Sequence, residues 1–308
     1  MLSILKNNFI WLIVTSLKGI AQVIFIDNAV SGFIILAGIT IASYSLGIVT
    51  LLSSIIGTLI GIAGGAEKES MNQGLLGYNS VLAGMALFLF LSGSDRWMIA
   101  LAGAAIAAIV TAAIMYFMRQ SGIPILTFPY IVTTWFLLLA SYRLATFKIS
   151  PDLKPQTLSN WDLDIKGEPH WLDGAVDGMG QIYFLDHNLS GVLLFIAVFW
   201  AGWRLGLYAI IGNAAALLTS YGLGGEHSLI FHGLYGYNAI LTILAVSAVF
   251  KEDNRNVLLS GIVAACLTVP ITASIDTWLL PYGMPALTMP FVLCTWIFLG
   301  ARKVLPRI

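Results

Sequence analysis

The sequence predicts an all-α integral membrane protein with about ten transmembrane helices and short re-entrant half-helices, arranged in two inverted-topology repeats. Three observations carry this prediction. Of its 308 residues, 58% are hydrophobic and 10% are charged, against about 25% charged in soluble domains, and the mean hydropathy is +0.89. The charges gather between long apolar segments, and those segments occur twice along the chain.

Each apolar segment is long enough for at least one crossing, because a spanning helix needs about 20 residues for a hydrocarbon core about 30 Å thick. The segment 28–66 has room for two helices, and the others for one each. The first half supplies residues 9–26, 28–66, 70–94, 97–118 and 120–142. The second half supplies residues 187–203, 205–225, 227–250, 256–275 and 277–301.

An internal repeat organises the chain. GLLGYNSVLAG at 74–84 returns as GLYGYNAILTI at 233–243, a spacing of 159 positions. The same spacing links Gly19 with Gly178, Gln22 with Gln181, Phe25 with Phe184, Asp27 with Asp186 and Glu67 with Glu226. At a spacing of 161, GIPILTFPYIVTTW at 122–135 matches GMPALTMPFVLCTW at 283–296. We therefore predict a first transmembrane repeat at 1–143, a polar extracytoplasmic linker at 144–166 and a second repeat at 167–308, with one pore between the repeats.

The predicted topology follows from parity and charge. If each repeat crosses five times, the second copy starts from the opposite side, as in many transporters. The positive-inside rule then places both termini in the cytoplasm. The basic residues near the termini are Lys6, Arg302, Lys303 and Arg307, and the linker region carries Asp152, Asp162, Asp164, Glu168 and Asp173 against Lys148, Lys154 and Lys166. The expected location is the cytoplasmic (inner) membrane, with multiple passes.

Helix breaks recur at matching places. Glycine-rich stretches with polar residues lie at 61–79 and 222–238, and proline segments lie at 122–129 and 283–290. In hydrocarbon, irregular backbone is tolerated only inside protein or beside a cavity, and paired interruptions of this kind indicate a transport site. The alternative is that these positions serve only close packing and kinks.

The residues beside the breaks are neutral amides, hydroxyls and aromatic rings, which suit a small neutral polar solute better than an ion. Glu67 and Glu226 are the exception, and they either couple transport to protons or ions or cap and support the short segments. Asp27 and Asp186 are interpreted as turn or helix-start residues. None of the four histidines is duplicated, which argues against a twin-histidine ammonium lane.

Several function classes lack support in the sequence. Cys266 and Cys294 lie in apolar runs and are interpreted as core residues. No nucleophile–base pair or metal-ligand cluster stands out, so we expect neither an enzyme nor a metal or cofactor. The net charge of zero gives no indication of a nucleic-acid partner.

Three duplicated motifs resemble the urea transporter family, in the form of a bacterial member. The first copy contains AQVIFIDNAVSG, GLLGYNSVLAG and IPILTFPYIVTTW, and the second contains GQIYFLDHNLSG, GLYGYNAILTI and MPALTMPFVLCTW. The resemblance covers nearly the whole chain. It implies a channel-like urea pathway between inverted halves, in a homotrimer with one pore per subunit, and a filter of two flat aromatic slots with a threonine-bearing site between them.

Carried onto this chain, the resemblance assigns one slot to Gln22, Val23, Phe25, Tyr78 and Leu82, the other to Gln181, Ile182, Phe184, Tyr237 and Leu241, and the middle site to Thr127 and Thr288. The leading hypothesis is passive conduction of urea across the lipid bilayer. The alternatives are a channel for another small solute, such as a short amide, ammonia or formate, and a proton- or ion-coupled transporter using Glu67 and Glu226.

Overall fold

A computed structural model describes residues 2–161, 163, 165–251 and 257–306. Within these ranges the chain forms fourteen α-helices, several short 3-10 or π segments and two strands of two residues each. The prediction of an all-α fold is therefore confirmed, with a very small sheet added. Asp162, Asp164 and Arg307, which entered the charge argument, lie outside the described residues.

The chain divides into two compact units. The first comprises Met1–Gln120 and Pro129–Asp152, and the second comprises Ser121–Phe128 and Leu153–Ile308. The eight residues Ser121–Phe128 come from the first sequence repeat but belong to the second unit. The predicted boundaries at 143 and 166 stay a prediction.

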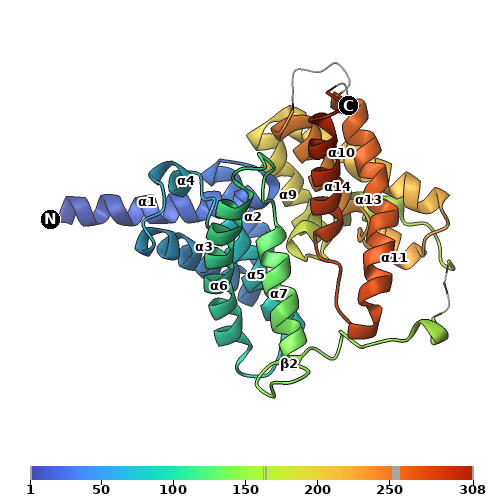
Figure 1. Ribbon diagram of the computed structural model, residues 1–308, viewed down its shortest axis with the longest axis horizontal. Coiled ribbons are helices and arrows are strands. Elements are labelled where there is room, and N and C mark those ends of the chain that lie inside the picture. Colours follow the sequence, from blue (N-terminus) through green and yellow to red (C-terminus); the bar gives the residue numbers. More distant parts are fainter. Residues whose placement is uncertain (1, 162, 164, 252–256, 307–308) are drawn as a thin grey trace. The chain divides into compact units, whose positions relative to one another are not determined.

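The first unit is built around α5 (Tyr78–Phe90), which packs against α3 and α6. Figure 1 shows α3, α5 and α6 grouped together. Nearly all of α5 is buried, from Tyr78 to Phe88, as expected for a helix that is apolar on every side. The other elements are α1 (Leu2–Ala21), η1 (Gln22–Ile24), α2 (Ala29–Ala42), α3 (Tyr44–Ala63), α4 (Lys68–Asn72), α6 (Arg96–Met118) and α7 (Phe128–Ala140).

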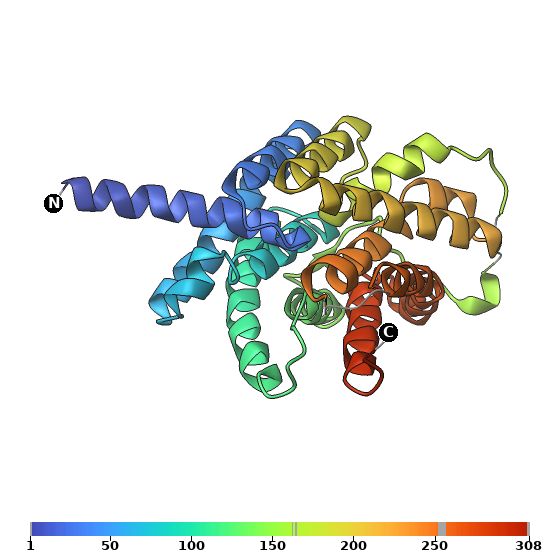
Figure 2. The same ribbon diagram turned by 90° about the horizontal axis from the view of Figure 1, so that it is seen from above.

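In the second unit α12 (Gly236–Leu244) has the corresponding place, packed against α10 and α13. α13 and α14 lie side by side in both views (Figure 1, Figure 2). The remaining elements are η2 (Leu158–Asn160), α8 (Trp171–Gly180), η3 (Gln181–Tyr183), α9 (Asn188–Ala201), α10 (Trp203–Gly222), α11 (His227–Phe231), η4 (Ala245–Val249), α13 (Val257–Leu279), η5 (Leu280–Tyr282) and α14 (Met289–Arg302).

Four described helices are long and apolar enough to cross a membrane, namely Tyr44–Ala63, Arg96–Met118, Trp203–Gly222 and Val257–Tyr282. Two bent pairs raise this to six if each counts as one span: Phe9–Ile24 with Ala29–Ala42, bent by 77°, and Trp171–Tyr183 with Asn188–Ala201, bent by 75°. Such bends are consistent with re-entrant halves. Reaching about ten crossings would also require the shorter apolar helices, so that number stays a prediction.

The run 28–66 forms two helices as predicted, because α2 ends and α3 begins at Ser43. Its hydroxyl accepts the N–H of Leu46 at 3.3 Å and caps α3. Asp27 was expected to be a turn or helix-start residue. Asn28 accepts the N–H groups of Val30 and Ser31 at 2.8 and 3.3 Å and caps α2, whereas Asp27 lies in the break between Ile24 and Ala29.

The helix α8 was missed from sequence because it is short and carries Asp173 and Asp177. These two aspartates interrupt the apolar segment that precedes the bend of the second repeat, so this segment is not a run free of charged residues. In the first copy the equivalent residues form the last part of α1, where Lys18 is the single charged residue.

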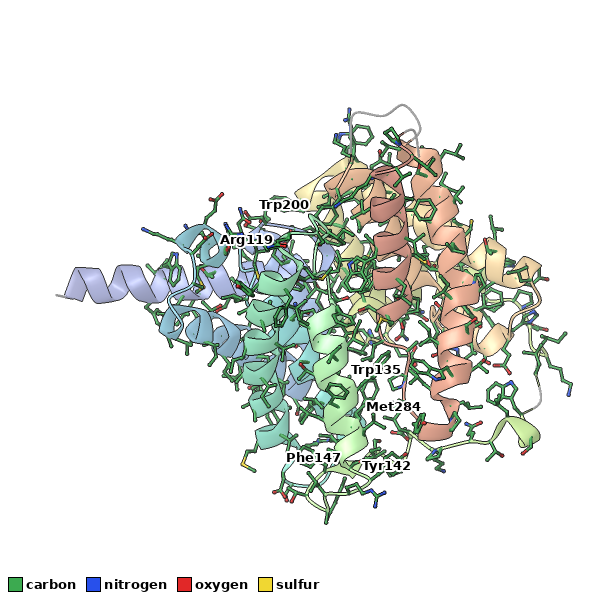
Figure 3. The ribbon with its side chains drawn as sticks, in the orientation of Figure 1. Arg119, Trp135, Tyr142, Phe147, Trp200 and Met284 are labelled. Carbon is green, nitrogen blue, oxygen red and sulfur yellow. The ribbon has the colours of Figure 1, made fainter. Side chains whose placement is uncertain are left out.

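The start of the linker is bound to the first unit by the small sheet. β1 (Leu91–Ser92) pairs antiparallel with β2 (Lys148–Ile149), and the N–H of Ser150 donates to the carbonyl of Phe90 at 2.8 Å. Tyr142 and Phe147, labelled in Figure 3, mark the stretch between α7 and β2. This part of the linker is therefore ordered against the end of α5.

One of the basic residues near the C-terminus has a structural role. The last turns of α12 widen into the π-helical segment η4, and Arg302 is only 3% exposed. Its guanidinium donates to the carbonyls of Phe250 and Val246 at 2.9 and 3.0 Å. A guanidinium suits this place because its rigid array of donors can satisfy two carbonyls at once.

Candidate functional site

Four strained residues mark the predicted site. Among the described residues, the only non-glycine residues with positive φ are Phe25 at 61°, Leu126 at 53°, Phe184 at 58° and Leu287 at 54°. They form two pairs at the repeat spacings of 159 and 161. For bulky residues the left-handed conformation is rare, and such strain gathers at functional sites. Leu126 and Leu287 were not among the predicted site residues, although each directly precedes a predicted threonine.

The first pair closes two matching turns that carry the predicted slot residues. In η1 the N–H of Phe25 donates to the carbonyl of Gln22 at 3.0 Å, and in η3 the N–H of Phe184 donates to Gln181 at 3.1 Å. Val23 is 1% exposed. Its counterpart, Ile182, is also 1% exposed, while both phenylalanines and both glutamines are half-buried. Each turn therefore buries its aliphatic residue and leaves an amide and a ring partly accessible.

The other predicted slot residues lie at the start of the helix that packs against each turn. η1 packs against α5, which carries Tyr78 and Leu82, and η3 packs against α12, which carries Tyr237 and Leu241. Both leucines are fully buried, Tyr78 is 9% exposed and Tyr237 is half-buried. Within each unit, the structure thus brings the two elements of the predicted slot together.

Glycine explains why the two motifs GLLGYN and GLYGYN are so similar. Gly74 and Gly233 have φ values of 75° and 76°. A Cβ at Gly233 would lie 2.3 Å from the backbone nitrogen of Gly178, and one at Gly74 would lie 2.5 Å from that of Gly19. The loop before the slot helix therefore lies directly on the helix before the turn, and a side chain would separate them.

The second strained pair holds the predicted middle-site threonines. Thr127 and Thr288 follow Leu126 and Leu287, and their hydroxyl oxygens lie 2.6 Å apart within the second unit. Each threonine is 2% exposed. Thr127 comes from the eight-residue segment that the first repeat contributes to this unit, so the pair joins the corresponding positions of both repeats.

Two asparagines fix the helices that follow these turns, a role that sequence reasoning missed. Asn238 accepts the N–H of Phe291 at 3.1 Å, and Asn79 accepts the N–H of Tyr130 at 3.3 Å. Both asparagines are fully buried. The bonded N–H groups lie in the first turns of α14 and α7, where no intrahelical acceptor exists. Duplication of Asn next to Tyr was visible in the sequence, but its partner was not.

The carbonyl oxygen of Leu287 accepts two side-chain hydrogen bonds. The Tyr237 hydroxyl donates to it at 2.6 Å, and the Asn238 amide donates at 3.3 Å. In the same unit, the indole N–H of Trp296 donates to the carbonyl of Pro124 at 2.8 Å. These bonds hold the strained turns from the side of α12 and from α14, so the threonine pair rests on a fixed backbone.

The paired carboxylates differ from each other. Glu67 is exposed, whereas Glu226 is 8% exposed. Their carbonyls begin α4 and α11 by accepting from Met71 and Ile230, both at 3.0 Å. In the described part of the chain, neither glutamate side chain caps its helix by a hydrogen bond. Side-chain capping is therefore not their role, a supporting role stays a prediction, and the two positions are not equivalent in burial.

Comparison with known proteins decides the family. Residues 13–303 match the sequence pattern of the family described as urea transporter. The chain belongs to the urea transporter family. It is 25% identical over 297 residues to urea transporter 1 of Ovis aries and to urea transporter 1 of Rattus norvegicus, covering 95% of this chain and 77% of each relative.

Membership in the urea transporter family confirms the coarse predictions of function. Urea transport is the activity of this family, so the predictions of a multi-pass membrane protein, of urea transport and of a non-enzymatic role are confirmed. The path of urea through this family member, its oligomeric state and its orientation are matters for proposal.

Proposed function

We propose that this chain conducts urea passively through a narrow filter built from the duplicated turns, with Thr127 and Thr288 at its middle. The observation that supports the proposal best is the hydroxyl pair, 2.6 Å apart. Each threonine directly follows a strained leucine, Leu126 or Leu287, and the two leucines occupy corresponding positions of the two repeats. Strain of this kind persists only where the surrounding structure holds it, and it commonly marks ligand sites.

The chemistry of the threonine pair suits urea. Urea is planar and neutral, with four N–H donors and one carbonyl. Each threonine hydroxyl has one donor and two lone pairs. After the mutual hydrogen bond, the pair still offers more acceptors than donors, which complements the excess of donors on urea. A flat amide-like solute that loses water without new partners would face a cost of about 4–8 kcal/mol, and these oxygens offset part of it.

The two duplicated turns that contain Phe25 and Phe184 are proposed as the two slots. Gln22 with Phe25, and Gln181 with Phe184, each combine an amide with a half-buried ring on one short turn. A ring face admits a flat molecule and excludes a hydrated ion, while the amide exchanges hydrogen bonds with it. Several shallow sites in series allow a solute to leave as readily as it binds.

The surroundings of the two paired glutamates favour passive conduction over coupled transport. Coupling through a symmetric pair would place Glu67 and Glu226 in similar surroundings. One is exposed and the other is buried, and the duplicated residues on the turns are neutral. We therefore propose no ion or proton coupling.

Assembly and location are proposed from the resemblance and the charge pattern. We propose a homotrimer with one pore per subunit, in a cytoplasmic membrane, with both termini on the cytoplasmic side. The bacterial placement stays a prediction. Chemical crosslinking of the purified protein and accessibility labelling of single cysteines near each terminus test these two points.

Stopped-flow urea flux into proteoliposomes, with no ion gradient imposed, tests the proposed function. We expect rapid, poorly saturating equilibration that a protonophore does not change. Flux that appears only after a proton or sodium gradient is applied would replace the passive channel with a coupled transporter. Competition by thiourea and methylated ureas, compared for Gln22→Ala and Gln181→Ala, tests the two slots separately.

A further inference from the structure

An acidic cavity of about 640 Å³ lies in the second unit, next to α8. Its lining includes all four histidines of the chain. Four carboxylates and one lysine, Lys166, also line it. The carboxylates are Glu168, Asp173, Asp177 and Asp186. With neutral histidines the described lining therefore carries an excess of negative charge, which favours a cation in the cavity.

Asp177 is the residue whose surroundings are incomplete. It is 6% exposed, and within the described part of the chain its Oδ1 has no hydrogen-bond partner. Burying an ionised carboxylate without a partner is costly. The charges of Asp186 and Asp173 act on it unfavourably, and that of His232 acts favourably. A positive partner at Asp177 would remove this imbalance.

The first repeat shows which group fits such a place. Lys18 and Asp27 occupy the positions that correspond to Asp177 and Asp186 at the repeat spacing of 159. There the Lys18 ammonium lies 2.8 Å from a carboxylate oxygen of Asp27. The second repeat keeps the carboxylate of this ion pair and replaces the ammonium by another carboxylate. The chain itself therefore supplies a comparison site in which an ammonium group is bound.

The side chains of Asp173 and His232, which lie near Asp177, already have partners of their own. Asp173 accepts from the Asn188 amide at 3.3 Å and lies 3.8 Å from His170. The Nδ1 atom of His232 lies 2.6 Å from the carbonyl of Ser228. Among the described residues, no three histidine, cysteine or carboxylate groups converge as ligands of a metal ion. A cation that donates hydrogen bonds fits this arrangement better than a chelated metal, which needs several converging ligands.

We propose that this cavity binds ammonium, with Asp177 and Asp186 as the carboxylates that hold it in place of the lysine ammonium of the first repeat. Ammonium carries four N–H donors and a full charge, so it can form charge-assisted hydrogen bonds with both carboxylates. The described lining of this cavity includes neither threonine and none of the proposed slot residues. Its test does not depend on urea flux, so it stands or fails independently of the proposed function.

Thermal unfolding of the purified full-length protein in detergent tests the site. The protein is heated in ammonium chloride and, in parallel, in N-methylglucamine chloride at equal ionic strength and pH 7.5. A ligand that binds only the folded state raises the unfolding temperature as its concentration increases. We expect a rise with ammonium that saturates. Asp177→Lys, which restores the ion pair of the first repeat, should abolish this response and unfold at a higher temperature in N-methylglucamine.

Asp95→Lys is the matched control, because it makes the same charge change at an exposed residue outside the cavity, and it should keep the response to ammonium. If Asp177→Lys does not fold, Asp177→Asn should fold and lose the response. Equal unfolding temperatures in the two salts for the unmodified protein would overturn the site. A response that persists in Asp177→Asn, or an equal response to potassium chloride, would overturn the assignment to ammonium.

Discussion

Replacing Thr127 and Thr288 by valine together removes both hydroxyls of the middle site and keeps the shape of the two side chains. In the double variant no hydroxyl of the pair is left without its partner, and the exchange of both partners for apolar groups of similar shape is nearly neutral for folding. A single Thr288→Val variant leaves the Thr127 hydroxyl, 2% exposed, without the bond of 2.6 Å that it makes now.

The expected magnitudes follow from these contacts. Loss of a buried hydrogen-bonding partner costs roughly 1–3 kcal/mol, so Thr288→Val alone should be less stable than the double variant by an amount of that order. For urea in transit, the same roughly 1–3 kcal/mol added to the barrier corresponds to about 5- to 150-fold slower flux. The double variant should therefore fold well and conduct poorly.

The assay combines two measurements on each variant. Thermal unfolding gives stability, and stopped-flow urea flux in proteoliposomes of equal protein content gives conduction. Urea flux at the unmodified rate in the double variant would refute the middle-site assignment. Greater stability of the single variant than of the double variant would refute the reasoning about the buried hydroxyl pair.

Substitutions at four further positions test the framework of the site through thermal unfolding. Asn238→Leu leaves the N–H of Phe291 without its acceptor at 3.1 Å and the carbonyl of Leu287 without the amide donor at 3.3 Å, and it should cost about 1–3 kcal/mol. Gly233→Ala places a methyl group 2.3 Å from a backbone nitrogen and should cost roughly 2–5 kcal/mol. Gly224→Ala, at a similar φ of 73° with open space around it, should cost only about 1–2 kcal/mol, and equal losses for the two glycines would contradict the close-approach argument. Arg302→Met removes two hydrogen bonds to carbonyls and should lower stability by about 1–3 kcal/mol, with an unchanged unfolding temperature counting against a structural role.

Much of the fold was predictable because hydrophobic length and repetition are properties of the sequence itself. The two helices within 28–66 and the glycine breaks followed from runs and spacings, and the family followed from the resemblance of the duplicated motifs. The bends of 77° and 75° did not, because they depend on Phe25 and Phe184 adopting a conformation that their residue type disfavours. The apolar residues around the first bend give no local signal for it.

The sequence led to a set of proposed site residues but not to the contacts that these residues make. Repetition identified Asn79 and Asn238, yet their acceptor role depends on N–H groups that lie 51 and 53 positions later. It also suggested Asp27 as the start of a helix, where Asn28 makes the bonds. Pairwise contacts of this kind are set by tertiary packing, which a single sequence does not encode in any local pattern.

The placement of residues 121–128 has a consequence for biosynthesis. Translation delivers this segment well before α8, yet its partners Thr288 and Trp296 follow Thr127 and Pro124 by 161 and 172 positions. The second unit can therefore close only after α14 has left the ribosome. Such late, long-range closure favours slow maturation. A gene split within the linker would yield a C-terminal fragment that lacks this segment and must obtain it from the other fragment to be completed.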